Sequence, residues 1–176
     1  MRIVVDLQSC QNASRLRGIG RYAMAITRAM IEAGEEHEFW IALSDRFPSA
    51  IAPIRAQLWG LLPPERIVVF SLPARVAGAD ESAAWRSRAA EALREHFLAS
   101  LRPDFVFLPS LFEGFWDDCV TSIGRQPIAT AVAIHDLIPL VWPNDFVTAP
   151  VERACYNRKL LSLKRVRSPG SHPRRY

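Results

Sequence analysis

Apolar runs alternate with amphipathic stretches along this chain. Five short apolar runs are typical of buried parallel strands, at residues 3–7, 38–43, 66–70, 105–108 and 128–134. Between and after them the pattern predicts helices at residues 19–33, within 50–62, at 82–101 and from 150 to about 164. Strands that alternate with helices predict an α/β fold, a Rossmann-like doubly wound parallel sheet.

The helical stretch at residues 82–101 has an apolar residue at every fourth position. These are Trp85, Ala89, Leu93, Phe97 and Leu101. Such spacing places them on one face of a helix, so we expect that face to be buried in the core rather than to meet a membrane or a partner.

The first strand and the first helix are joined by the run Arg17-Gly18-Ile19-Gly20-Arg21. A strand, a glycine-bearing loop and a helix together place free backbone N–H groups and the positive helix end at the edge of a sheet. Gly18 and Gly20 allow a phosphate or sugar to approach the backbone, and Arg17 and Arg21 can bind a phosphate with two donors each. An ordinary strand-to-helix turn with two solvated arginines has the same pattern, so both interpretations stay open.

Unusual polar residues follow three of the predicted strands, in the segments 8–21, 110–118 and 135–136. Ligands of doubly wound sheets bind outside the carboxyl ends of the strands, so we expect the site where these segments meet. Two structural alternatives remain open. His135 can cap the turn that ends its strand, and Asp117 with Asp118 can cap the start of a helix.

Length and composition indicate one globular domain, with 176 residues, 49% hydrophobic and 23% charged. No apolar run approaches the roughly 20 residues that a membrane span needs. The N-terminus has no secretion-signal pattern, and the three cysteines are widely spaced and odd in number. We therefore expect a cytoplasmic protein with reduced thiols rather than disulfides or a zinc site.

The net charge of +4 is concentrated near the C-terminus. Residues 153–176 hold eight Lys or Arg and no Asp or Glu, whereas the other 152 residues carry 14 basic and 18 acidic side chains. A nucleic-acid-binding domain needs its basic face in the body, so we expect no nucleic-acid partner for the body of this domain.

Several motifs in order resemble the N-terminal half of family-4 glycosyltransferases, most closely the bacterial mannosyltransferases of surface-polysaccharide and lipopolysaccharide assembly. They are R-I-V-V-D-L, R-G-I-G-R-Y, S-L-F-E-G-F, D-D-C-V-T-S-I-G-R-Q-P and A-I-H-D-L-I-P-L. The resemblance implies a GT-B enzyme with two Rossmann-like domains facing a cleft. Such an enzyme transfers a hexose, with retention, from a nucleotide sugar to a growing polysaccharide or a lipid-linked acceptor. It needs no cofactor and no obligatory metal, and a lipid-linked acceptor would place it peripherally at the inner membrane face.

The resemblance also implies roles for individual residues. Gly18 and Gly20, with Arg17 and Arg21 beside them, match the glycine loop that borders the donor diphosphate and the acceptor. His135 matches the histidine that contacts the transferred sugar, which would make it the catalytic residue. Asp136 is similar to the second residue of the family's H-D pair, which implies that it shapes the turn. The resemblance assigns no role to Glu113 and Asp117, and our hypothesis is that Glu113, Asp117 and Asp136 contact the acceptor hydroxyls.

The family pattern ends near residue 165, where Pro, Gly, Ser and Arg begin to dominate. We expect a glycosyltransferase domain at residues 1–165 and a disordered basic tail, read out of frame, at 166–176. On this hypothesis the chain is truncated. The C-terminal donor domain would lie in another frame or chain, and the polypeptide alone would have little or no activity.

Two other functions compete with the enzyme hypothesis. One is a non-catalytic module that binds a nucleotide or phosphosugar through the glycine loop, while its basic tail meets an anionic membrane surface or a nucleic acid. The other is a dinucleotide enzyme. It is disfavoured because Ala23 replaces the third glycine of its fingerprint and the nearest acidic residue, Asp45, lies 25 residues after Gly20.

Overall fold

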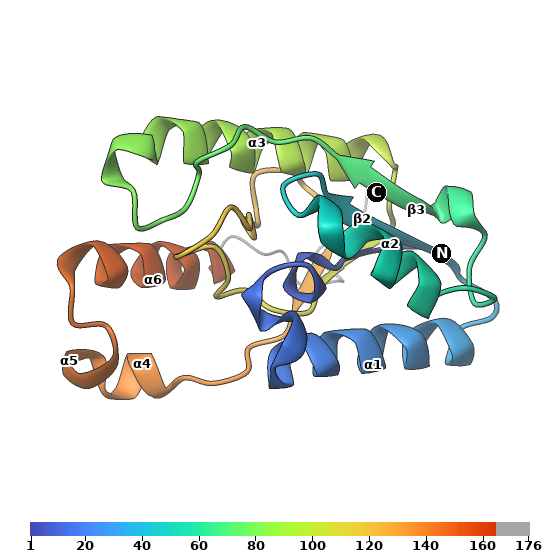
Figure 1. Ribbon diagram of the computed structural model, residues 1–176, viewed down its shortest axis with the longest axis horizontal. Helices are drawn as coiled ribbons and strands as arrows, with labels where there is room; N and C mark the ends of the chain where they lie inside the picture. The colour runs from blue at the N-terminus through green and yellow to red at the C-terminus, as the bar shows by residue number, and fades with distance from the viewer. Residues whose placement is uncertain (165–176) are drawn as a thin grey trace, which may run out of the picture.

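The computed structural model describes residues 1–164, which form a single five-stranded sheet flanked by helices (Figure 1). The strands are β1 (Arg2–Asp6), β2 (Glu38–Ser44), β3 (Ile67–Phe70), β4 (Phe105–Leu108) and β5 (Thr130–Val132). They lie in the order β3-β2-β1-β4-β5, and every neighbouring pair is parallel. This confirms the predicted α/β, Rossmann-like sheet, the form expected of one half of a GT-B enzyme.

Helices cover both faces of the sheet. They are α1 (Gly18–Ala33), α2 (Pro48–Gln57), α3 (Ala84–Ser100), α4 (Ile138–Val141), α5 (Pro143–Phe146) and α6 (Pro150–Leu163), with the 3-10 turns η1 (Gln8–Cys10), η2 (Ala13–Leu16), η3 (Pro64–Arg66) and η4 (Glu81–Ala83). Alternate side chains of β1 point to opposite faces, so Ile3 and Val5 pack under α1 and α2 while Val4 packs under α3. In Figure 1, α1 and α3 accordingly lie on opposite sides of the sheet.

The strand order places a topological switch point between β1 and β4. The chain runs from β1 outward to β2 and β3 and then returns to the other side of β1 to form β4. The loops after β1 and β4 therefore diverge at the carboxyl edge, where ligands of such sheets bind. Figure 1 shows α4, α5 and α6 beyond this edge.

The buried stripe of α3 matches the predicted one only in part. Phe97 and Leu101 pack, partly buried, against the core as expected. Trp85 is 67% exposed and Leu93 50% exposed, so the expectation that they are core residues was wrong. The buried positions of α3 are Ser87, Ala90, Arg94, Glu95 and Leu98. The helix is rotated this way because Arg94 forms an ion pair with Asp6 at the end of β1. Apolar periodicity could not reveal a buried face that includes charged residues.

The other predicted elements are present, with shifted ends. Gly34 follows α1 as its C-cap, Pro150 opens α6, and β5 covers only the middle of its apolar run. No helix within residues 1–164 is long and apolar enough to cross a membrane. The predicted tail at residues 166–176 lies outside the described residues, as does the predicted domain end at residue 165, and both stay predictions.

Candidate functional site

Two buried glutamines in the loop after β1 fix the neighbouring loops. The Gln8 side chain donates from Nε2 to the carbonyl of Val120 at 2.7 Å and accepts from the Val120 N–H at 3.0 Å. Gln11 makes the same pair of bonds with the backbone of Ser44, at 2.9 and 2.7 Å. Each side-chain amide therefore pairs with both backbone groups of its partner residue, as a neighbouring peptide group would, and satisfies them. Neither glutamine stood out in the sequence as a functional or structural residue.

A buried ion pair fixes the segment after residue 118. Asp6 and Arg94 are 0% and 1% exposed, and Nε of Arg94 donates to Oδ2 of Asp6 at 2.5 Å. Nη1 of Arg94 donates to the carbonyl of Ser122 at 2.7 Å. Asp6 also accepts from the backbone N–H and the side-chain amide of Gln8. One carboxylate thus connects β1, α3 and the loop that follows β4.

Glu113 joins the glycine loop to the loop after β4. Its Oε2 accepts from Asn12 Nδ2 at 2.6 Å and from Ser14 Oγ at 3.1 Å, and its Oε1 accepts from Ser110 Oγ at 2.8 Å. Because η2 leads directly into α1, these bonds position the start of that helix. The carboxylate that we expected to contact an acceptor is occupied by three donors of its own chain.

Asp117 and Asp118 close loops rather than cap a helix. Oδ1 of Asp117 accepts from the N–H of Cys119 at 2.9 Å, and burial raises the pKa of this carboxyl. Asp118 accepts from the backbone N–H groups of Arg75 and Val76 at 3.0 and 2.8 Å. No helix begins here in the described chain, so the helix-capping alternative was wrong.

The two glycines before and within α1 differ in their surroundings. A Cβ at Gly20 would lie 2.5 Å from the carbonyl oxygen of Ser14 and 2.5 Å from Cα of Arg15, so η2 already fills that space. A Cβ at Gly18 would meet no heavy atom within 4 Å. Gly18 is therefore open to close approach of a ligand, whereas Gly20 has no room for a side chain beneath η2. Gly20 and Arg21 instead line a separate cavity of about 570 Å³ between α1 and α2.

The two arginines of the glycine loop are exposed at the start of α1. Nη2 of Arg21 donates to the carbonyl of Leu16 at 3.3 Å, and Arg17 precedes the first turn as its N-cap. The dinucleotide alternative is weakened further, because Asp45 uses Oδ1 to accept from the N–H of Leu72 at 3.2 Å. A dinucleotide enzyme would need this carboxylate to bind the ribose, but here it holds the chain that follows β3.

His135 lies between α1 and the loop after β4. Its Nε2 is 2.8 Å from the carbonyl oxygen of Pro109 and therefore donates to it, which leaves Nδ1 as an acceptor in the neutral ring. The ring of Tyr22 packs against it edge-on, with centroids 5.0 Å apart. Oδ1 of Asp136 accepts from the N–H of Ile138 at 3.0 Å and so begins α4. The turn-holding contact of His135 is thus present, and residues 1–164 give Nδ1 no hydrogen-bond partner.

These segments enclose a cavity of about 320 Å³ at the carboxyl edge. The expected residues Glu113, His135 and Asp136 line it, whereas Arg17, Arg21, Gly18, Gly20 and Asp117 do not. Most of the other lining residues come from α6 and from residues 110–118, which we call the aromatic loop. We had assigned no role to these: Phe112, Phe115, Trp116, Glu152, Tyr156 and Lys159. The three predicted segments therefore converge, and α6 closes the space between them.

Lys159 attaches α6 to the wall of this cavity. Its ammonium donates to the carbonyl of Leu111 at 2.9 Å, to Thr121 Oγ1 at 2.5 Å and to the carbonyl of Glu113. All three of its N–H donors are used. Burial lowers the pKa of this lysine. Lys159 therefore serves to hold the helix in place.

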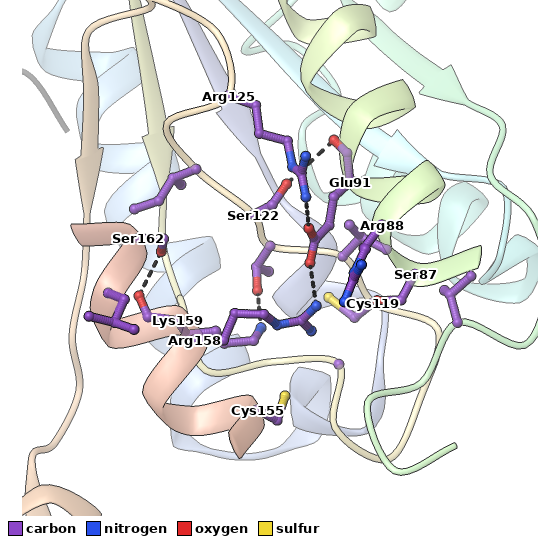
Figure 2. Close-up of a pocket in the computed structure, with 16 residues that line it drawn as sticks. Ser87, Arg88, Glu91, Cys119, Ser122, Arg125, Cys155, Arg158, Lys159 and Ser162 are labelled. Carbon is purple, nitrogen blue, oxygen red and sulfur yellow. Dashed lines mark hydrogen bonds and ion pairs between the residues drawn. The ribbon is translucent and has the colours of Figure 1, made fainter. Parts of the chain in front are cut away.

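A second cavity, of about 230 Å³, lies between α3, residues 114–125 and α6. Figure 2 shows the Glu91 carboxylate between Arg125 and Arg158, at 2.5 and 3.2 Å. Within residues 1–164 no three His, Cys, Asp or Glu side chains are grouped to hold a metal ion. Because the first cavity, unlike the second, is lined by residues of all three predicted segments, we place the candidate site there.

Sequence comparison places this chain beside mannosyltransferases. It is 35% identical over 169 residues to the serotype-specific mannosyltransferase WbdA of Escherichia coli. The aligned region covers 94% of this chain and 20% of that protein. A second E. coli protein of the same name is 33% identical over 144 residues, or 80% of this chain. No protein-family model and no solved structure matches. The predicted kinship with mannosyltransferase-type glycosyltransferases is confirmed, and the chain spans about a fifth of the length of these relatives.

Proposed function

We propose that this chain is the acceptor-side domain of a glycosyltransferase that transfers a hexose, with mannose as the first candidate, from a nucleotide sugar to a growing bacterial surface polysaccharide. The observation that carries the proposal is the 35% identity to a mannosyltransferase along 94% of the chain. The transfer proceeds with retention at the anomeric carbon and needs no obligatory metal. A GT-B cleft also requires a second Rossmann-like domain, from the same or another polypeptide, to hold the donor.

The positions of the candidate residues support this chemistry. Transfer requires donors near the leaving diphosphate and polar groups near the sugar, where positive charge develops. The first N–H groups of α1 have no partner within the helix, and Gly18 leaves them open to a ligand. Arg17 and Arg21 add positive charge beside them. In this proposal Nδ1 of His135 contacts the transferred sugar.

The acceptor is a saccharide, free or linked to a lipid. A lipid-linked acceptor would bring the protein to the inner face of the cytoplasmic membrane as a peripheral protein. The non-catalytic alternative depends on the basic segment at residues 166–176, which lies outside the described residues.

A chimera tests the proposal. This chain replaces the matching segment of E. coli WbdA, and transfer of radiolabelled mannose from a nucleotide sugar to an α-mannose-terminated acceptor is measured. We expect transfer by the chimera and a loss of at least about a hundredfold in its His135→Ala variant. His96→Ala is the matched control, because His96 is exposed on α3 and lines neither cavity.

Two results would contradict the proposal. One is a folded chimera without transfer, when parent WbdA is active under the same conditions. The other is a His135→Ala chimera that is as active as the His96→Ala chimera, which would leave His135 with its turn-holding role alone.

A further inference from the structure

We infer that the 320 Å³ cavity is a subsite for an uncharged hexose unit of the acceptor glycan, which stacks on Trp116 and hydrogen-bonds to the hydroxyl of Tyr156. The choice of a hexose rests on the proposed function. The cavity lies at the lower end of the roughly 300–1,000 Å³ of small-molecule sites, a size that suits a single sugar ring.

Trp116 presents an aromatic face to the solvent at the rim of the cavity. It is 81% exposed, and the ring of Phe115 supports it edge-on with centroids 4.7 Å apart. An exposed indole that lines a cavity gains free energy when an apolar surface covers it, at about 25 cal/mol per Å². A pyranose ring has such a surface on its C–H face and hydroxyls on its edge. Trp116 can therefore bind the face while polar groups bind the edge.

Tyr156 supplies a polar group without a partner. Its side chain is 9% exposed and stacked on Phe112 at 4.5 Å, and within the described residues its buried hydroxyl has no hydrogen-bond partner. A buried hydroxyl left unpaired costs about 1–3 kcal/mol, so it requires an explanation. Burial, with a smaller contribution from Asp136, raises the pKa of Tyr156 and keeps the hydroxyl protonated. A sugar hydroxyl in the cavity would provide the missing partner.

The charges around the cavity favour a neutral ligand over a phosphate. Three carboxylates line it, those of Glu113, Asp136 and Glu152. The ammonium of Lys159 is committed to its three acceptors, so it offers no free donor to an anion. Carboxylates accept hydrogen bonds from sugar hydroxyls and repel phosphates. In this inference the donor diphosphate binds at the backbone N–H groups that begin α1, beside this cavity rather than within it.

The position of His135 connects the subsite to the transfer reaction. His135 lines the same cavity and also touches Tyr22 of α1. A hexose seated on Trp116 would therefore lie between the aromatic loop and the residue proposed to contact the transferred sugar. This is where an acceptor hydroxyl must be held for transfer.

The test is direct binding of an α-linked mannose disaccharide to the purified chain, measured by saturation-transfer NMR and by titration. We expect binding by the wild-type chain, a loss of about tenfold or more in Trp116→Ala, and a loss of about fivefold in Tyr156→Phe. Trp59→Ala is the matched control, because Trp59 is 80% exposed and lines neither cavity. We expect it to bind the disaccharide as the wild-type chain does.

Three results would overturn the inference. They are no saccharide binding by the wild-type chain at millimolar concentrations, equal losses in Trp116→Ala and Trp59→Ala, or tighter binding of mannose 1-phosphate than of methyl mannoside. The last would identify a phosphate site instead. Because binding is measured without transfer, an active chimera with no saccharide binding would reject only the subsite. Saccharide binding with an inactive chimera would reject only the proposed function.

Discussion

Arg94 is the side chain whose loss we expect to damage this fold most. It is 1% exposed, and Nε and Nη2 both lie 2.5 Å from Oδ2 of Asp6, which is fully buried. Replacing Arg94 with Met keeps most of the aliphatic volume but leaves the carboxylate buried without its cation. The substitution also removes the donor to the carbonyl of Ser122.

The size of the effect follows from the partners that remain. Breaking a buried ion pair by removing one partner costs about 3–5 kcal/mol. Asp6 keeps three hydrogen bonds from Gln8, at 3.0 to 3.2 Å, which places the loss toward the lower end of that range. The unpaired Ser122 carbonyl adds about 1 kcal/mol. We therefore expect Arg94→Met to lower the free energy of unfolding by about 4 kcal/mol, or the melting temperature by about 10 °C.

Urea denaturation of four proteins checks this value: wild type, Arg94→Met, Asp6→Asn and the double variant. Asparagine at position 6 removes the charge and keeps an acceptor for Gln8, so the double variant should be more stable than Arg94→Met alone. Arg88→Met is the control, because Arg88 lies exposed on the same helix and should change stability by less than about 0.5 kcal/mol. A loss under 1 kcal/mol in Arg94→Met, or additive losses in the double variant, would refute the reasoning.

Four further predictions concern packing and protonation. Gly20→Ala should destabilise the fold by about 2–3 kcal/mol in thermal denaturation because its Cβ would meet backbone atoms at 2.5 Å, whereas Gly18→Ala should be nearly neutral; equal effects would contradict the packing role. All three cysteines are buried, so a thiol reagent at pH 8 should modify none in the native protein and three after unfolding. Burial, with Glu113, raises the pKa of Cys10 from 9.0 to about 12. The thiol of the unfolded chain therefore loses its proton at lower pH than the folded one. As a result the free energy of unfolding falls above pH 9, by about 2 kcal/mol at pH 10.5, and Cys10→Ala should not show this loss. Lys159→Met leaves three acceptors without their donor and should lower the free energy of unfolding in urea by about 2 kcal/mol. An unchanged denaturation midpoint would contradict the role of Lys159 in holding α6.

The sheet could be predicted from the sequence because its signals are local. Each strand is a short apolar run, and Pro150 and Gly34 mark helix ends through their own backbone preferences. The meeting of the three polar segments also followed, since the carboxyl ends of parallel strands share one edge. The contact between Asn12 and Glu113 confirms that two of these segments meet, and the bond from His135 to Pro109 connects the third to the loop after β4.

The polar contacts within the fold could not be predicted, because they join residues far apart in the chain. Arg94 is separated from Asp6 by 88 residues, and Gln8 from Val120 by 112. Nothing in the local pattern of α3 distinguishes a buried arginine from a solvated one, so the predicted stripe was right at Phe97 and Leu101 and wrong at Trp85 and Leu93. The orphan hydroxyl of Tyr156 was equally invisible, since it becomes informative only when α6 is placed against the cavity.

Helix α6 decides whether the candidate subsite exists. It contributes Glu152, Tyr156 and Lys159 to the cavity, whereas the glycine loop and the sheet edge are held by Glu113, Gln8 and Arg94 without it. In our proposal two neighbouring environments have separate tasks. The start of α1, which the switch point between β1 and β4 positions, would bind the anionic donor, and α6 with the aromatic loop forms a wall with an acidic lining. An enzyme that joins a charged donor to a neutral acceptor needs two such neighbouring environments, because one pocket cannot favour both charges.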